Sequence, residues 1–184
     1  MARRGPIAPP VKLAFFVEGD SDKDFIESLA PRILGPGVRT HVVRVGGKAA
    51  LASTFPEVAQ FLEAGYAAVF VVVDADTVIA NDVSLQKQRL ADVYRRYGLE
   101  DRVQIVMAVP MLETWLLAAY VEHPERSLHP KQDLAKHLGP LSGDTIRSLA
   151  AKLPIEVVRR RTKSFDELAT GLEAFAPTRA RRAS

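Results

Sequence analysis

The chain has 184 residues, 47% of them hydrophobic, which is the size of one domain with enough apolar material for a buried core. It contains no cysteine, which excludes disulfides and thiol catalysis and favours a cytoplasmic protein, and no apolar run reaches the roughly 18–20 residues of a membrane-spanning helix, so no membrane association is expected. The net charge of +3 comes from basic residues in segments 1–12 and 177–184, so the rest of the chain is net negative and charge alone does not indicate a nucleic-acid-binding protein.

Short apolar runs alternate with amphipathic stretches along the first two thirds of the chain. The runs typical of buried strands are 12–17, 39–45, 67–73 and 103–109. The stretches between and after them predict helices over 21–34, 48–64, 82–97 and 111–121. Ser21 and Asp24 have the spacing of a capping box, and Pro56 predicts a kink or a late start in the second helix. This alternation predicts an open parallel α/β sheet in which the first and third strands are neighbours.

The last third of the chain has a different character. Short helical stretches are separated by prolines, at Pro124, Pro130, Pro140 and Pro154. We therefore expect four parts, which are a flexible leader, an α/β domain, a helical extension and a basic tail, with the boundaries 1–10, 11–122, 123–176 and 177–184.

Acidic side chains follow three of the four predicted strands. Glu18 follows the first, Asp74 and Asp76 follow the third, and Glu113 follows the fourth. The carboxyl ends of parallel strands meet at one edge of a sheet, where functional groups gather. Clustered carboxylates repel one another unless a cation lies between them, and Mg²⁺ prefers oxygen ligands. The alternative is that an aspartate caps the following helix and that Glu18 is a solvated loop residue.

Several of these segments resemble the TOPRIM domain of topoisomerases, primases and some nucleases. The resemblance rests on Phe15-Phe-Val-Glu18-Gly19-Asp20-Ser21-Asp22 and on Val71-Val-Val-Asp74-Ala-Asp76. With Gly46-Gly47-Lys48 and Val109-Pro-Met-Leu-Glu113-Thr-Trp115, the chain is most similar to small stand-alone bacterial TOPRIM proteins related to the nuclease half of the overcoming-lysogenization-defect (OLD) proteins. The resemblance covers about residues 11–120, and it implies a TOPRIM-like sheet, Mg²⁺ or Mn²⁺ as cofactor and DNA or RNA as partner.

The resemblance also implies roles for individual residues. Glu18 is similar to the family's general acid/base or metal-adjacent glutamate, and Asp74 and Asp76 are similar to its metal ligands. Asp22 matches a further acidic position of OLD-like proteins, although it also suits the positive end of the helix dipole. Glu113 matches a second-metal or supporting carboxylate, or else is simply a glutamate in the first turn of a helix.

Basic residues offer further candidates. Lys48, after two glycines, is suited to neutralise a phosphate, although a solvated surface lysine is the plainer interpretation. A dense basic cluster is suited to grip a phosphate backbone, or else forms a solvated helix face; it consists of Arg159, Arg160, Arg161 and Lys163. Trp115 is interpreted as a core residue rather than as a platform for a base.

These features together predict divalent-metal-dependent cleavage of nucleic-acid phosphodiesters by a nuclease or nickase. The first alternative is a TOPRIM-type module that binds nucleic acid or protein without catalysis. A second is a phosphatase of the haloacid-dehalogenase type, for which Asp74 and Asp76 follow the wrong strand. The chain has no Gly-x-x-x-x-Gly-Lys-Ser/Thr loop, so an ATPase of the kind that OLD proteins carry would be a separate partner. The resemblance also suggests a role in defence against phage.

Overall fold

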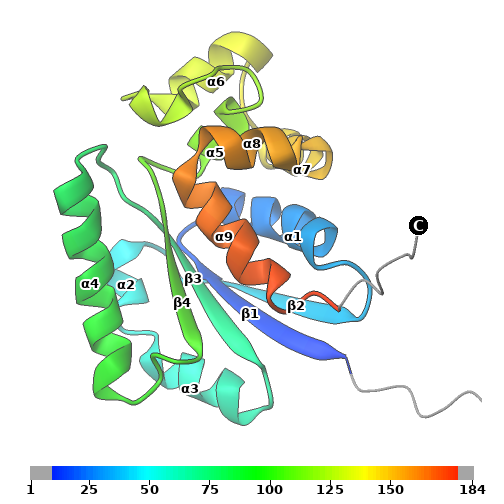
Figure 1. Ribbon diagram of the computed structural model, residues 1–184. Coiled ribbons are helices and arrows are strands. Elements are labelled where there is room, and N and C mark those ends of the chain that lie inside the picture. Colours follow the sequence, from blue (N-terminus) through cyan, green and yellow to red (C-terminus); the bar gives the residue numbers. More distant parts are fainter. Residues whose placement is uncertain (1–9, 178–184) are drawn as a thin grey trace, which may run out of the picture.

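A computed structural model describes residues 10–177, which form a parallel sheet with helices on both faces (Figure 1). The leader expected over 1–10 and the tail expected over 177–184 lie outside the described residues, apart from Pro10 and Pro177. The α/β fold is therefore as predicted. Its strands are β1 (Val11–Val17), β2 (Val38–Arg44), β3 (Ala68–Asp74) and β4 (Val103–Ala108).

The helices follow the predicted positions with two departures. The stretch 48–64 divides into two helices, and Pro56 lies in the first turn of the second, which begins at Phe55, as expected for a residue without an N–H to donate. The last helix of the α/β part is shorter than its predicted range of 111–121. Within the first 122 residues the helices are α1 (Asp20–Leu34), α2 (Lys48–Leu51), α3 (Phe55–Glu63), α4 (Ala80–Arg96) and α5 (Glu113–Leu117).

The start of α1 corrects the predicted capping box. The helix begins at Asp20, with Gly19 as its N-cap, so the third helical position belongs to Asp22 rather than to Asp24. The Asp22 carboxylate accepts the Gly19 N–H over 2.9 Å. Asp24 instead forms an ion pair with Arg147 of the C-terminal region. The prediction failed because it placed the helix start at Ser21.

The strand order places a topological switch point between β1 and β3. The sheet has the order β2-β1-β3-β4, and all of its pairs are parallel. The chain passes from β1 to β2 on one side and then returns to β3 on the other side of β1. In open α/β sheets, ligands bind at such a point, outside the carboxyl ends of the strands. The predicted adjacency of the first and third strands is therefore confirmed.

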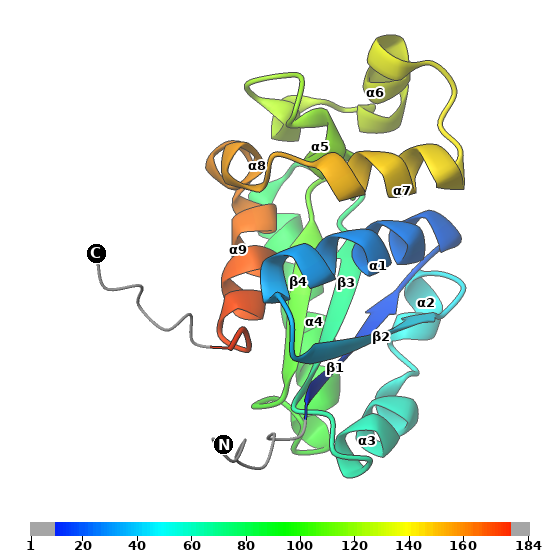
Figure 2. The same cartoon turned by 90° about the vertical axis from the view of Figure 1, so that its right-hand side faces the viewer.

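The two faces of the sheet carry separate apolar cores. Alternate side chains of the central strands enter opposite cores, as Phe15 and Phe16 of β1 do. One face is covered by α2, α3 and α4, and the other by α1 and α9 (Figure 2). Both faces are apolar, as expected for a parallel sheet enclosed between two helical layers.

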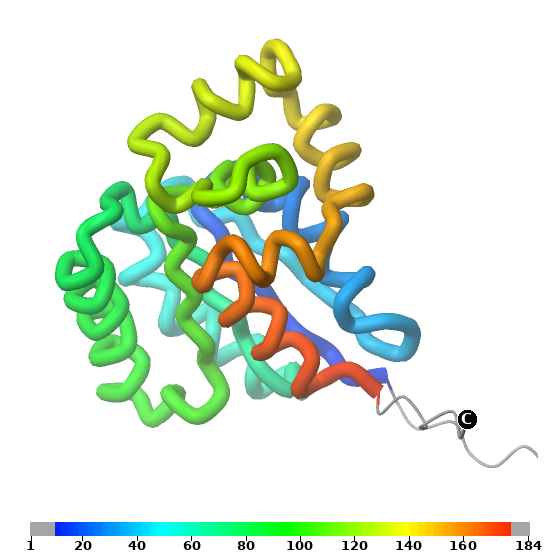
Figure 3. The backbone as a smooth tube through the Cα atoms, turned by 45° about the horizontal axis from the view of Figure 1, so that its top comes forward, coloured from blue at the N-terminus to red at the C-terminus, as the bar shows by residue number. Residues whose placement is uncertain are grey.

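The C-terminal region completes one of these layers rather than standing apart from the α/β part. Its last helix packs on the sheet through buried side chains such as Phe165, Leu168 and Leu172, which share a core with Phe70 and Val106. In Figure 3, β4 runs between α4 on one side and α9 on the other. Within residues 10–177, no helix has the length and apolar character needed to cross a bilayer. The region contains the short 3₁₀ helix η1 (Pro124–Arg126) and the helices α6 (Pro130–Leu138), α7 (Gly143–Lys152), α8 (Ile155–Arg161) and α9 (Lys163–Glu173).

Candidate active site

Glu18 and Asp74 meet at the switch point. Glu18 follows β1 directly, and Asp74 is the last residue of β3. The Glu18 Oε1 atom accepts a hydrogen bond from the Asp74 main-chain N–H over 3.0 Å. Burial raises the pKa of Glu18, and this hydrogen bond opposes the rise because it favours the ionised form. Glu18 therefore keeps its proton to a higher pH than an exposed glutamate does.

The carboxyl group of Asp74 is held within a negative environment. Its Oδ1 atom accepts the Leu112 N–H from the loop after β4, over 2.8 Å. Burial, followed by the negative charges of Asp22 and Glu113, raises the pKa of Asp74 to about 8. At neutral pH this group is mostly protonated unless a cation compensates its charge.

Asp22 and Glu113 complete what we call the acidic cluster, defined as Glu18, Asp22, Asp74 and Glu113. Burial is also the main cause that raises the pKa of Asp22 and of Glu113. The positive charge of Lys131 in α6 opposes the rise in both. Lys131 was missed in the sequence analysis, because only the packing of α6 brings it to this edge.

Asp76 belongs to a neighbouring ion pair rather than to the acidic cluster. Its φ of 54° turns the chain sharply after β3, and its N–H donates to the Pro110 carbonyl oxygen over 2.8 Å. Its Oδ2 atom lies 2.7 Å from the Lys48 Nζ. The Asp76 charge raises the pKa of Glu18 but is not among the causes that raise the pKa of Asp74. The Asp74 and Asp76 carboxylates thus have different partners, whereas the sequence suggested that both would bind one metal.

The four residues of the predicted basic cluster have different surroundings. Arg159 forms ion pairs with Asp166 over 2.8 Å and with Glu173 over 2.6 Å, so it holds α8 against α9. Arg160 is exposed. Arg161 and Lys163 line a cavity beside the sheet. Only these two are therefore placed to act together on a ligand.

Trp115 is a core residue, as interpreted from the sequence. Its side chain is fully buried, and its ring packs against Phe25 and Phe165. Its indole N–H donates to the Ser164 hydroxyl over 2.9 Å. Trp115 thereby ties α5, next to the acidic cluster, to the start of α9.

The acidic cluster fits a hard divalent cation in donor type and in charge. Its four members offer only carboxylate oxygens, and burial, followed by neighbouring negative charges, raises their pKa values and makes their ionised forms costly without a cation. As the side chains stand, no three histidine, aspartate or glutamate side chains among residues 10–177 are arranged to hold one ion. Binding of one ion by three of them therefore requires side-chain rotation.

No family profile, curated protein or solved structure matches the chain. The acidic cluster and the ion pair beside it are therefore the features of the protein that indicate a function.

Proposed function

We propose that the protein is a divalent-metal-dependent nuclease that cleaves nucleic-acid phosphodiesters at the acidic cluster. The observation that carries this proposal is the perturbed Asp74, whose pKa is raised to about 8 at the switch point of the sheet. Burial, and then the neighbouring negative charges, make the ionised form of this group costly to the fold, so its placement calls for a functional explanation. A divalent cation supplies one.

Each residue of the site has a role that follows from its contacts. Asp74, Asp22 and Glu113 supply the oxygens that would hold the cation. Mg²⁺ or Mn²⁺, when bound, would lower the pKa of a coordinated water and stabilise negative charge on phosphate. Glu18, with its raised pKa, exchanges a proton with the attacking water or the leaving group. Lys48 lies beside Glu18, whose pKa it lowers, and it offers a positive charge to the phosphate.

The decisive experiment measures cleavage of supercoiled plasmid and of single-stranded RNA with Mg²⁺, with Mn²⁺ and with EDTA. We expect cleavage with either metal, faster with Mn²⁺ because it binds such sites more tightly. Asp74→Asn and Glu18→Gln should each lower the rate at least about 100-fold. Asp101→Asn is the matched control, because Asp101 is exposed and lies at the opposite end of the sheet, just before β4.

Two outcomes would contradict the proposal. Cleavage that survives Asp74→Asn would show that the activity comes from another site or from a contaminant. Binding of nucleic acid without cleavage under any metal condition would instead support the non-catalytic binding module.

A further inference from the structure

A cavity of about 540 Å³ lies at the carboxyl end of β4, next to the acidic cluster but separate from it. Its walls come from the start of α4, the end of β4, the segment around η1 and the junction of α8 with α9. None of the four acids of the cluster lines it. Its volume is in the range of pockets that hold a small ligand.

The charge of the cavity favours an anion. Four permanent cations line it against two acids, and both acids already have partners. Glu167 is ion-paired with Lys87, and Glu125 accepts from the hydroxyl and the N–H of Ser164. The other cations are Arg126, Arg161 and Lys163.

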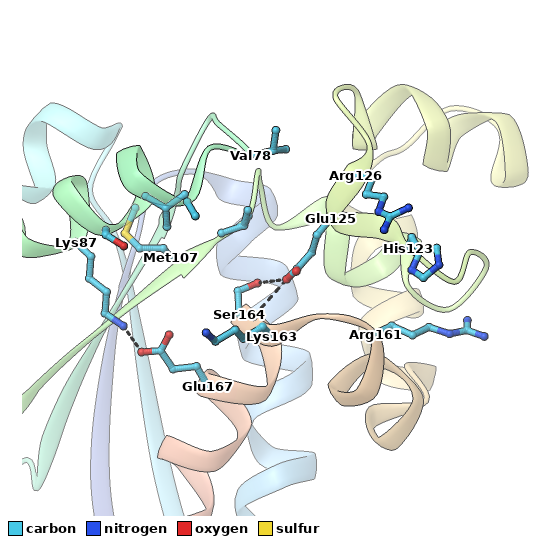
Figure 4. Close-up of a pocket in the computed structure, with 14 residues that line it drawn as sticks. Val78, Lys87, Met107, His123, Glu125, Arg126, Arg161, Lys163, Ser164 and Glu167 are labelled. Carbon is cyan, nitrogen blue, oxygen red and sulfur yellow. Dashed lines mark hydrogen bonds and ion pairs between the residues drawn. The ribbon is translucent and has the colours of Figure 1, made fainter.

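These three cations keep donors available. Among residues 10–177, Arg126 and Lys163 have no side-chain hydrogen bond or ion pair, and Arg161 donates only to the Ala118 carbonyl oxygen. Figure 4 shows Arg126 and Arg161 on the same side of the cavity as His123, with Lys87, Met107 and Glu167 on the other side, and Lys163 and Ser164 between the two groups. A ligand in the cavity would therefore meet the positive charges of Arg126 and Arg161 on one side, and apolar surface beside the Lys87–Glu167 ion pair on the other.

The apolar side of the cavity and its location indicate which class of anionic ligand it binds. Val78, Val83, Met107 and Val109 supply apolar surface that suits the face of a nucleobase or a sugar. Val78 and Val109 belong to the same two loops that carry Asp76 and lead to Glu113. These loops are joined where the Asp76 N–H donates to Pro110. A nucleic-acid strand that extends from the cavity to the acidic cluster would therefore pass over these two loops.

We propose that this cavity binds one nucleotide of the substrate strand, adjacent to the phosphodiester that the acidic cluster cleaves. The proposal rests on the nuclease function, and it adds the determinant that positions the strand. The base or sugar lies on the apolar side, and the phosphate faces Arg126, Arg161 and Lys163. No residue of the cavity takes part in the bond-breaking step.

Binding can be tested without cleavage, by fluorescence anisotropy of a labelled single-stranded oligonucleotide of about 12 nucleotides in EDTA. Val83→Trp fills the apolar side, and we expect it to weaken binding about tenfold, the scale of one lost base contact. Leu85→Trp is the matched control, because Leu85 is exposed on the same helix and does not line the cavity.

A second pair of variants tests the cations by salt dependence. For a single strand, each lost phosphate contact lowers the slope of log K against log salt by about 0.7, so the double variant Arg126→Ala/Lys163→Ala should lower it by about 1.4. Arg96→Ala/Lys152→Ala removes two exposed cations that do not line the cavity and should leave the slope unchanged. These variants still test the proposal if the Val83→Trp protein does not fold.

The outcomes separate this proposal from the nuclease function. Equal effects of Val83→Trp and Leu85→Trp, an unchanged slope in Arg126→Ala/Lys163→Ala, or no binding by the wild type would each overturn the cavity assignment. Displacement of the strand by 5′-AMP at matched nucleotide concentration would show a mononucleotide site and would also overturn it. Wild-type protein that binds the oligonucleotide through the cavity but does not cleave it would refute the proposed nuclease function and would support the cavity as a nucleotide-binding site.

Discussion

The acidic cluster and the cavity share one end of the sheet, but they are built in different ways. Glu18, Asp22 and Asp74 are fixed by main-chain N–H groups of Asp74, Gly19 and Leu112, at strand ends and loops. The cavity is instead assembled from side chains of α4, β4 and the adjoining loops together with those of the C-terminal region, which meet only when that region docks. The first arrangement follows from the sheet topology, whereas the second depends on helix packing. Changes to helix packing should therefore affect the two regions unequally.

The largest effect expected from a single substitution comes from one that disrupts the docking of the C-terminal region. Trp115→Ala removes a fully buried side chain that packs on Phe25 and Phe165, and such truncations cost about 3–5 kcal/mol. At about 2–4 °C per kcal/mol, the melting temperature should fall by about 10 °C. Strand binding should weaken with it, because the start of α9 lines the cavity.

Trp115→Phe is the control for this change, because it retains most of the packing and loses the hydrogen bond to Ser164. Its cost should be near 1 kcal/mol. A Trp115→Ala protein with unchanged melting temperature would show that the C-terminal helices dock without this side chain.

A second prediction concerns the acidic cluster alone. The pKa of Asp74 is raised from 3.8 to about 8, so the folded state binds a proton that the unfolded state releases. The metal-free protein should therefore lose stability as the pH rises from about 4 to about 8, by at most about 1.4 kcal/mol per pH unit. Asp74→Asn keeps the acceptor for the Leu112 N–H and removes the charge, so its loss across this range should be smaller.

Thermal melts at a series of pH values, all in EDTA, measure this difference. Asp101→Asn serves again as the control and should follow the wild type. Parallel pH profiles for Asp74→Asn and the wild type would mean that Asp74 does not titrate in the way its surroundings imply.

The sequence allowed the acidic cluster to be predicted better than the cavity, for a physical reason. Strand ends are visible as apolar runs, and parallel strands place their carboxyl ends at one edge, so Glu18 and Asp74 could be brought together without coordinates. The direction of a side chain after a strand is not visible in this way. At Asp76 a positive φ turns the chain, and the carboxylate pairs with Lys48.

The basic site could not be predicted from the sequence in the same way. Arg159, Arg160, Arg161 and Lys163 are neighbours in sequence, yet they divide between a structural ion-pair network, solvent and the cavity. Arg126, from a segment that carried no motif, lines the cavity with Arg161 and Lys163. Neighbours in sequence therefore did not define the basic site, because packing of several short helices decides which side chains meet.

Addition of Mg²⁺ distinguishes the acidic cluster from the cavity, because only the acidic cluster is expected to bind the metal. At ten times its Kd, Mg²⁺ should stabilise the wild type by about 1.4 kcal/mol, which raises the melting temperature by about 3–6 °C. The Asp74→Asn protein should show little of this rise, whereas Arg126→Ala/Lys163→Ala should show all of it. Equal rises in Asp74→Asn and the wild type, measured by differential scanning fluorimetry, would count against Asp74 as a ligand.

The smallest effect is expected from Gly171→Ala in α9, and its sign is informative. In an open helix, alanine in place of glycine would stabilise by about 1 kcal/mol. Here the added Cβ would meet the side chain of Gln104 and would lie 3.1 Å from Phe70 Cε1. Phe70 is fully buried in the core of that face and cannot withdraw freely. We therefore expect a net loss of about 1 kcal/mol, because overpacking of this kind outweighs helix propensity.

A double variant tests whether this loss of stability comes from the contact with Gln104. Gln104→Ala removes the flexible neighbour, so the double variant Gln104→Ala/Gly171→Ala should recover part of the stability relative to Gln104→Ala alone. Because α9 contributes Lys163, Ser164 and Glu167 to the cavity, Gly171→Ala should also weaken strand binding slightly in EDTA. It should leave the pH profile set by Asp74 unchanged, since the acidic cluster is held by the strand ends and their loops. A Gly171→Ala protein that is more stable than the wild type would show that α9 packs less closely on β3 and β4 than the structure indicates, and the cavity would then lose its fixed wall.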